Sequence, residues 1–209
     1  ALRDGGVMPP EVAAAQAIRL VESGPVGGVL AAAYFARRAG IQDVIAFDMG
    51  GTTAKVSVVK NGAPLIVTDF EVARAARFKR RSGLPLKISS VELIEVGAGG
   101  GSIGVKDRLG LLKVGPRSAG SVPGPACYGR GGSEATVTDA DLTLGFLNPD
   151  FFLGGELPLH PNIALEALAR LGEDLGIGPT KCAQGIYDVV NRQMALAMRT
   201  HVVERGFDP

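Results

Sequence analysis

One tight turn built from small residues constrains this chain more than any other feature. An apolar segment at 44–47 runs into Asp48 and Met49, and the residues Gly50, Gly51, Thr52 and Thr53 follow at once. A second strand-like segment covers 54–59, and Asn61-Gly62 after it is a strong hairpin signal. The sequence therefore predicts two strands joined by a turn that carries little side-chain bulk.

The same turn has the composition of a phosphate-binding element. Small residues let backbone N–H groups approach a phosphate, and successive N–H groups in a turn form a concavity that binds anions. The hydroxyls of Thr52 and Thr53 add donors, whereas the Asp48 carboxylate repels phosphate and suits a divalent metal instead. The alternative is an ordinary hairpin with an Asp-Gly type of turn.

Composition narrows the class of protein. The chain has 209 residues, enough for one substantial core or two small ones, with 46% apolar residues, 21% charged residues and a net charge of +1. This balance argues against a nucleic-acid partner, and no apolar run has membrane-spanning length. Two cysteines do not make a disulfide framework, so we expect a reducing, cytoplasmic setting. The single dense basic run is interpreted as a solvated loop or helix face: Arg74, Arg77, Lys79, Arg80 and Arg81.

Hydrophobic periodicity gives a coarse map of the chain. Residues 11–22 have helical composition, with a short strand at 18–21 as the alternative, and a small-residue helix is predicted near 25–38. Strands dominate from 44 to 114, and a loop rich in glycine and proline covers 115–133. Two helices are predicted near the end, at 163–175 and 183–204. We expect a single domain over 1–209, with a strand-rich phosphate-binding part at 1–114 and a loop and helical part at 115–209.

A second glycine-rich turn and a cysteine are further candidates. The second turn either donates N–H groups to phosphate or substrate, or is a tight turn between strands: Gly99, Gly100, Gly101 and Ser102. Ser102 lacks a local base and is not expected to be a nucleophile. Cys127 lies near Arg130 in a glycine- and proline-rich loop, where catalysis, structural packing and metal contact are all open.

Two aspartates lie two positions apart. If the segment is extended, Asp139 and Asp141 face one side and suit a metal or general-base role; the rival interpretation is a helix N-cap. The two histidines, His160 and His201, are widely spaced and are interpreted as structural, and Cys182 is expected in the core.

Several unusual segments together resemble one family. They are FDMGGT at 47–52, VGAGGGSI at 96–103, VGPRSAG at 114–120, PGPACYGRGG at 123–132, TVTDADL at 136–142 and VERG at 203–206. With the small-residue helix before the first segment, the chain resembles the hydantoinase A/oxoprolinase family over nearly its whole length from about Ser23. That family also contains the nucleotide-binding subunits of acetone-type carboxylases.

The resemblance implies an α/β, actin-like (ribonuclease H-like) ATPase core with a mixed sheet, glycine-rich loops and flanking helices. It implies ATP and Mg²⁺ as cofactors and a reaction in which the carbonyl of a cyclic amide, such as a hydantoin or 5-oxoproline, is phosphorylated before ring opening. The alternatives are the ATP-binding subunit of an acetone-type carboxylase and a non-enzymatic actin-like nucleotide-binding module. A second, larger hydantoinase B-type subunit is an expected partner.

The resemblance also implies that these residues are a central portion of a longer polypeptide. Full-length members carry another DxGGT element and a further glycine-rich nucleotide element, whereas this sequence has one DxGGT. Thr53-Ala54-Lys55 departs from the Ser-Thr-Asp-like run of many relatives, and Lys55 is given no catalytic role.

The expected site combines these assignments. Catalytic roles are expected for Asp48, Asp139 and Cys127, and metal binding for Asp48 and Asp139. Nucleotide contacts are expected from Gly50, Gly51, Thr52, Thr53, Gly99, Gly100, Gly101 and Ser102.

Overall fold

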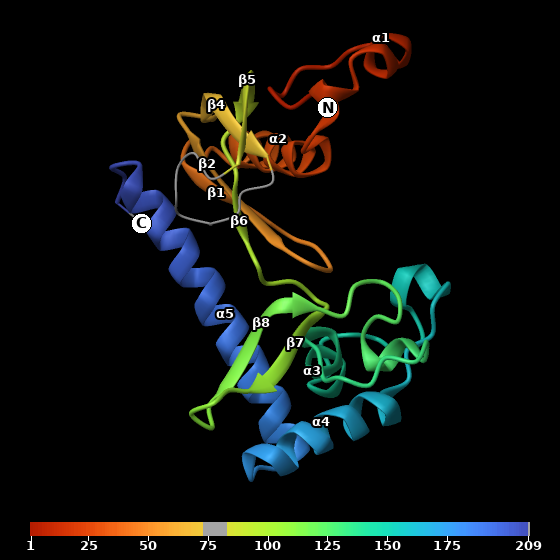
Figure 1. Ribbon diagram of the computed structural model, residues 1–209. Helices are drawn as coiled ribbons and strands as arrows, with labels where there is room; N and C mark the ends of the chain where they lie inside the picture. The colour runs from red at the N-terminus through yellow and green to blue at the C-terminus, as the bar shows by residue number, and fades with distance from the viewer. Residues whose placement is uncertain (73–82, 209) are drawn as a thin grey trace. The chain divides into compact units, whose positions relative to one another are not determined.

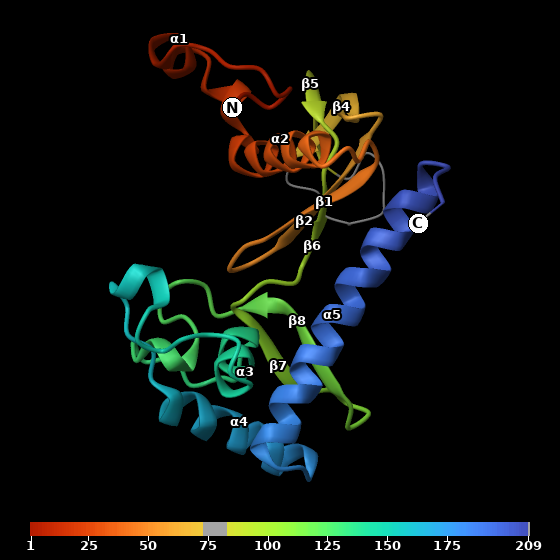
Figure 2. The same cartoon turned by 180° about the vertical axis from the view of Figure 1, so that it is seen from behind.

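The computed structural model describes residues 1–72 and 83–208 and confirms an α/β protein (Figures 1 and 2). The predicted basic run at 74–81 lies outside the described residues. The chain divides into two compact units, one made of 1–48 and 55–94 and the other of 49–54 and 95–209. Within the described part of the chain, no helix is long and apolar enough to cross a membrane.

The first unit contains most of the strands. Its elements begin with α1 (Pro10–Ala15), the 3-10 helix η1 (Ala17–Leu20) and α2 (Ser23–Arg38). The strands that follow are β1 (Val44–Met49), β2 (Ala54–Lys60), β3 (Ala63–Pro64), β4 (Ile66–Val72), β5 (Leu84–Val91) and β6 (Ile94–Val96), and the chain passes between units within β1, β2 and β6.

Helix α2 supplies the core of the first unit. Pro25 suits the first turn, Arg37 and Arg38 complement the dipole in the last turn, and Gly40 follows with φ +74°. Val26, Val29 and Ala33 recur at helical spacing and form one buried cluster with residues of three strands. Those strand residues are Ala46, Val59 and Val91. The predicted helix at 25–38 is therefore confirmed, with its start two residues earlier.

Short turns dictate the strand pairing. Asn61 (φ 51°) and Gly62 (φ 73°) form the two-residue turn that joins β2 to β3, with Lys60 opposite Ala63. Strands β1, β2 and β3 are neighbours in that order, with β6 beside β2. The pairs β2–β3 and β4–β5 are antiparallel, and the two-residue turn at 61–62 requires this arrangement of the first pair.

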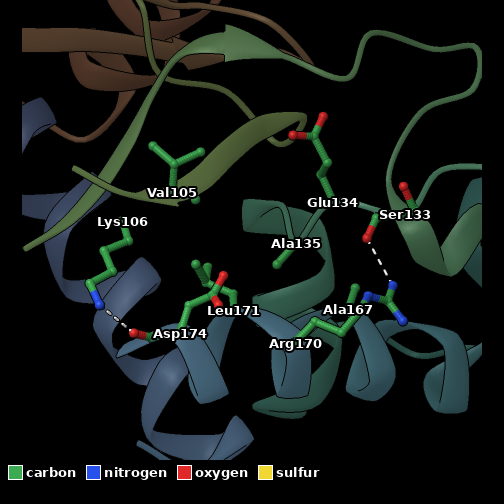
Figure 3. Close-up of a pocket in the computed structure, with 10 residues that line it drawn as sticks. Val105, Lys106, Ser133, Glu134, Ala135, Ala167, Arg170, Leu171 and Asp174 are labelled. Carbon is green, nitrogen blue, oxygen red and sulfur yellow. Dashed lines mark hydrogen bonds between the residues drawn. The ribbon is translucent and has the colours of Figure 1, made fainter. Parts of the chain in front are cut away.

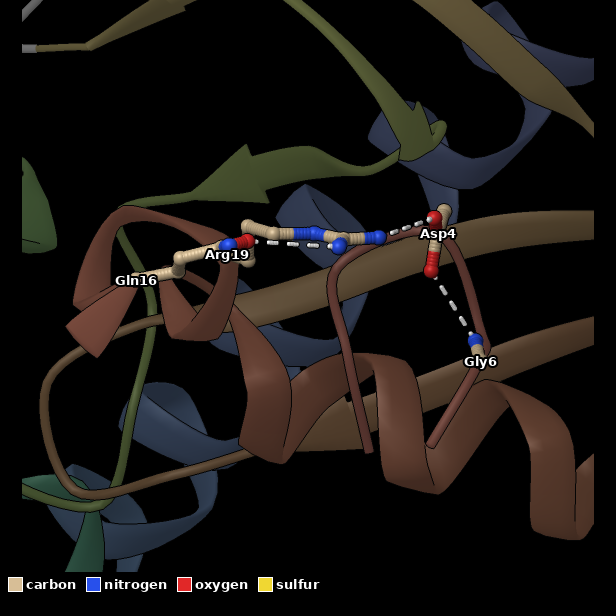
Figure 4. A network of polar contacts seen from close by, with 4 residues as sticks. All are labelled: Asp4, Gly6, Gln16 and Arg19. Atoms are coloured by element: carbon tan, nitrogen blue, oxygen red, sulfur yellow. Dashed lines mark hydrogen bonds and ion pairs between the residues drawn. The ribbon is translucent and has the colours of Figure 1, made fainter. Parts of the chain in front are cut away.

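The N-terminal segment is held by a small polar network (Figure 4). The Asp4 carboxylate accepts a hydrogen bond from the Gly6 N–H (3.0 Å) and lies 3.5 Å from the Arg19 guanidinium. Arg19 also reaches the Gln16 side chain at 3.5 Å. All of these groups are exposed or partly exposed, so the network orders the segment without adding much stability.

The second unit packs one hairpin against helices. Its elements are β7 (Ser102–Lys106), β8 (Leu112–Ser118), η2 (Ala126–Tyr128), α3 (Val137–Thr143), η3 (Phe152–Gly155), α4 (Pro161–Leu175) and α5 (Pro179–Glu204). The sequence placed α5 four residues late because its first turn is polar. Helix α4 ends where predicted, at Gly176 with φ +71°.

A glycine sets the distance between β7 and two helices. A Cβ added at Gly104 would lie 3.0–3.1 Å from side-chain atoms of Ile186 on α5 and Leu171 on α4. Strand β7 can pack this closely only because Gly104 has no side chain. Within the β7–β8 hairpin, Val114 pairs with Gly104. Strand β8 covers Leu112–Ser118, so the predicted boundary between the two halves of the chain, at 114/115, falls inside this strand.

Candidate functional site

The DxGGT turn presents two backbone donors to solvent. The Gly50 N–H closes the turn on the Thr53 carbonyl (2.9 Å), while Gly50, Gly51 and Thr52 are exposed. The carbonyls of Gly50 and Gly51 accept hydrogen bonds from the N–H groups of Gly100 (3.0 Å) and Gly101 (2.6 Å).

The direction of these bonds fixes where the free donors point. Both peptide bonds of the turn are trans, and a trans peptide directs its C=O and N–H to opposite sides. Because the carbonyls of Gly50 and Gly51 point toward the 99–101 segment, the N–H groups of Gly51 and Thr52 point away from it. Neither N–H has a hydrogen-bond partner among residues 1–72 and 83–208. Two successive exposed N–H groups on one side of a turn form an anion-binding concavity.

The second glycine segment supports the turn from behind. A Cβ at Gly99 would lie 2.6–2.7 Å from backbone atoms of Gly51 and Thr52, so only glycine fits there. All four N–H groups of 99–102 are used within the protein: Gly99 donates to the Ser102 hydroxyl (2.9 Å), Gly100 and Gly101 to the turn, and Ser102 to the Gly99 carbonyl (3.0 Å). The geometry therefore argues against direct phosphate contact by these N–H groups and gives the segment a supporting role.

A threonine that the sequence analysis did not identify fixes the position of the 99–101 segment. The N–H and the hydroxyl of Thr138, near the start of α3, both donate to the Gly100 carbonyl at 2.8 Å. Thr138 lies 38 positions from Gly100, so no local pattern connects the two residues. On the other side, the Ala119 N–H donates to the Gly101 carbonyl (2.8 Å).

Asp48 carries an exposed carboxylate just before the turn. It lies at the end of β1, exposed, beside Gly28 of α2, and its side chain has no hydrogen bond to any described residue. Mg²⁺ at a nucleotide is commonly held by one or two carboxylates together with phosphate oxygens and water, so an unpaired carboxylate fits that ion. The described residues contain no group of three or more His, Cys, Asp or Glu side chains arranged to hold a metal by themselves.

Asp139 has a structural role in this geometry. Its carboxylate is fully buried and accepts four hydrogen bonds, from the N–H groups of Ala126 (3.2 Å), Cys127 (2.7 Å) and Thr136 (2.9 Å) and from the Thr136 hydroxyl (2.7 Å). Thr136 and Asp139 form a capping box at the start of α3. These contacts argue against the predicted metal and catalytic roles, because both carboxylate oxygens are engaged and inaccessible.

Asp141 does not share a face with Asp139. The segment is helical rather than extended, and residues two apart on a helix are separated by about 200°. Burial raises the pKa of the Asp141 carboxyl to about 6. The predicted pair of carboxylates at one position is therefore corrected.

Cys127 is also embedded in the structure. It is fully buried and packs with Leu142, Leu159 and Ala164. Burial, followed by the charge of Asp139, raises the pKa of its thiol well above the usual range, so the thiolate needed for nucleophilic attack is disfavoured. This environment argues against the catalytic alternative and favours the packing alternative.

The remaining predicted residues take structural positions. His160 occupies the N-cap position of α4 without a side-chain cap bond, and its backbone N–H donates to the Cys127 carbonyl (2.8 Å). His201 is buried in α5, where burial lowers its pKa. Cys182 is fully buried, as predicted.

A separate hollow of about 330 Å³ lies beside β7 and α4 (Figure 3). Its two cations are engaged with backbone carbonyls: Lys106 Nζ donates to Asp174 (2.6 Å), and Arg170 Nη2 donates to Ser133 (2.9 Å). None of its lining residues belongs to the turn at 50–53 or to the 97–102 segment. We assign no ligand to this hollow.

Known proteins resemble the chain over nearly its full length. The family described as Hydantoinase/oxoprolinase matches residues 2–209. Caprolactamase subunit alpha of Pseudomonas jessenii is 40% identical over 207 residues, which cover 99% of this chain and 28% of that subunit. The gamma subunit of acetophenone carboxylase from Aromatoleum aromaticum is 40% identical over 195 residues, covering 92% of this chain and 26% of that subunit.

Two solved structures share the fold. The crystal structure of the ATP-dependent caprolactamase from Pseudomonas jessenii superposes with a TM-score of 0.74 at 39% identity, over 92% of this chain and 27% of the other. A nucleotide-free acetone carboxylase structure superposes with a TM-score of 0.80 at 28% identity, over 100% of this chain and 28% of the other. The chain thus spans less than a third of the length of these relatives.

Proposed function

The chain belongs to the hydantoinase/oxoprolinase family, and from this premise we propose that it is part of an ATP-dependent enzyme that opens a cyclic amide. Relatives that bear the names caprolactamase and 5-oxoprolinase act on such rings. The proposed role of these residues is to hold the phosphates of ATP while the ring carbonyl is activated.

One observation carries the proposal. The N–H groups of Gly51 and Thr52 point to the same side of an exposed turn and have no partner among the described residues. The Thr52 hydroxyl, which likewise has no partner in that part of the chain, adds a third donor. Backbone donors fixed before the substrate arrives stabilise phosphate charge without reorganisation.

The proposed reaction proceeds in two steps. The ring carbonyl oxygen attacks the γ-phosphorus of ATP, an O–P bond forms, and the bond to the bridging oxygen of ADP breaks. In the second step water adds to the activated carbon and the C–N bond breaks to leave an amine and an acyl phosphate, and a second water then hydrolyses the acyl phosphate, giving an amino acid, ADP and phosphate. The turn at 50–53 would bind and orient the phosphates in the first step.

Mg²⁺ fits the available carboxylate. Asp48 would hold the ion, which when bound neutralises phosphate charge. The carboxylate itself is negatively charged, so without a cation it repels the nucleotide. Because of this negative charge, we assign metal binding to Asp48 and phosphate binding to the backbone of the glycines.

A carboxylase role is the second candidate. Acetophenone carboxylase gamma subunit and acetone carboxylase beta subunit are relatives, at 40% and 32% identity. In that case ATP would phosphorylate an enolate or bicarbonate at the same turn. Because several relatives are named as subunits, we also propose that the whole enzyme works with a second, larger subunit, in the cytoplasm.

Phosphate release by the full-length enzyme tests the proposal. We expect ATP turnover to be stimulated by a lactam or hydantoin, and Asp48→Ala to reduce turnover to background with the fold intact. Asp150→Ala is the matched control, since Asp150 is also exposed and its carboxylate has no hydrogen bond within the described residues. Stimulation by ketone and bicarbonate instead would favour the carboxylase, and turnover that no substrate changes would favour a nucleotide switch. Normal turnover in Asp48→Ala would refute the metal assignment.

A further inference from the structure

We propose that Thr138 is a positioning residue for the phosphate-binding turn, acting through Gly100. This inference rests on the proposed function of the turn at 50–53. Thr138 makes no hydrogen bond to the turn within the described residues. Its hydroxyl restrains the Gly100 carbonyl, and the N–H groups of Gly100 and Gly101 hold the carbonyls of the turn.

Gly100 is held from both sides. Its carbonyl accepts two hydrogen bonds from Thr138, one from the N–H and one from the hydroxyl, each at 2.8 Å. Its N–H donates to the Gly50 carbonyl at 3.0 Å. A shift of Gly100 toward or away from α3 is therefore passed directly to the peptide between Gly50 and Gly51, whose N–H is one of the proposed phosphate donors.

The fit around Gly100 leaves little freedom. A Cβ on Gly100 would lie 2.8 Å from the Thr138 hydroxyl oxygen, so this close approach requires glycine. Thr138 itself is only 7% exposed. The hydroxyl is thus held in a partly buried contact, in which a hydrogen bond contributes more than it would in water.

Thr138 lies in the first turn of α3, which is itself held in place by other hydrogen bonds. The capping box of Thr136 and Asp139 closes the first turn of α3, and the buried Asp139 carboxylate ties that turn to the N–H groups of Ala126 and Cys127. Ile103 of β7 forms a bridge with Thr136. The start of α3 is therefore attached to the strand that follows the glycine segment, and the hydroxyl of Thr138 is held at a constant position.

Removal of the hydroxyl should have a local effect. Valine has nearly the shape of threonine, and Thr138→Val keeps the backbone N–H bond to Gly100. The capping box, the core and the 99–101 bonds to the turn are all left in place. What changes is the restraint on the Gly100 carbonyl, together with the hydrogen bond between the Thr138 and Tyr128 side chains, so the expected loss is one of position rather than of folding.

The experiment compares Thr138→Val with Thr138→Ser in the full-length enzyme. Serine keeps the hydroxyl, and Thr143→Val is the matched control because Thr143 lies on the same helix and has no side-chain hydrogen bond to a described residue. The readouts are KM for ATP, KM for the cyclic amide, kcat, and the hydrogen-exchange rates of the amides of Gly100 and Gly101.

We expect Thr138→Val to raise KM for ATP and the Gly100 exchange rate about fivefold each, the loss typical of one hydrogen bond. KM for the amide should stay within twofold, and both Thr138→Ser and Thr143→Val should resemble the natural enzyme. Unchanged exchange and KM in Thr138→Val would overturn the inference. Equal effects in Thr138→Ser would also overturn it, since the methyl group and not the hydroxyl would then matter.

Failure of the proposed function gives a different pattern. If saturating ATP leaves the amide signals of Gly51 and Thr52 unshifted in the full-length enzyme, the turn is not the phosphate site. In that case faster Gly100 exchange in Thr138→Val without any change in KM would show that Thr138 shapes a turn with no role in nucleotide binding, and the positioning role would be refuted with it.

Discussion

Replacement of Gly99 by alanine tests the packing behind the phosphate turn most directly. The added Cβ would lie 2.6 Å from the Thr52 carbonyl carbon and 2.7 Å from the Gly51 carbonyl carbon and the Thr52 nitrogen. Ordinary van der Waals contact begins at 3.4 Å, so the gap between 2.6 Å and 3.4 Å is 0.8 Å. The neighbouring atoms are backbone, so one of the two segments must move as a whole.

The expected cost has two parts. Overpacking in a close contact typically costs about 1–3 kcal/mol. The same movement strains the bonds that Gly100 and Gly101 make to the turn, each of which contributes about 1 kcal/mol. We therefore expect Gly99→Ala to lower the free energy of unfolding of the second unit by about 2–4 kcal/mol.

The assay is denaturant unfolding together with amide chemical shifts of residues 50–52. Gly27→Ala is the matched control: it makes the same change in a helix interior, with no atom within 4 Å of the new Cβ. Because alanine is the better helix former, that variant should be more stable by up to about 1 kcal/mol. A Gly99→Ala protein with natural stability and unshifted amides at 50–52 would refute the packing argument.

Three further outcomes are expected. Burial raises the pKa of the Asp141 carboxyl from 3.8 to about 6, so the folded state binds this proton more tightly than the unfolded state does. The resulting contribution to stability is complete below about pH 4 and is lost as the pH rises through about 6. Asp141→Asn should accordingly raise stability at pH 7.5 by about 1 kcal/mol, allowing for partial solvent screening, and leave it unchanged at pH 3.5; unfolding midpoints at the two pH values check this. Neither Cys127 nor Cys182, both buried with raised thiol pKa values, should react with a thiol reagent at pH 8 until the protein unfolds, and fast labelling of the native protein would contradict their core positions. The 209-residue chain alone, with one DxGGT element, should bind ATP with a Kd of about 1 mM by calorimetry, so micromolar binding would show that a second element is not needed.

Local signals predicted the elements well. The Asn61-Gly62 turn, the end of α4 at Gly176 and the apolar periodicity of α2 each depend on residues close together in the sequence. A helix start in the TVTDA segment, with aspartate as its N-cap, is the rival interpretation of Asp139; in the structure Thr136 is the N-cap and Asp139 lies three positions later. The burial of Asp139 and the four hydrogen bonds that its carboxylate accepts, and not the choice of cap residue, argue for a structural carboxylate.

The sequence by itself determined that a tight DxGGT turn lies between two strands, because the small residues and the hairpin signal are contiguous. It also determined the family, through long and unusual segments. Only the tertiary structure decided which donors of the turn are free. A glycine N–H can bind phosphate only if no carbonyl of the protein accepts a hydrogen bond from it. Here the carbonyls of Gly50 and Gly51 accept hydrogen bonds from Gly100 and Gly101, about 50 positions away, and this directs the N–H groups of Gly51 and Thr52 outward. Thr138 in turn holds Gly100. Such long-range hydrogen bonds produce no periodic pattern in the sequence. The glycines that hold the turn, at 99–101, could therefore not be distinguished from those whose N–H groups are exposed, at 50–51, before the fold was known.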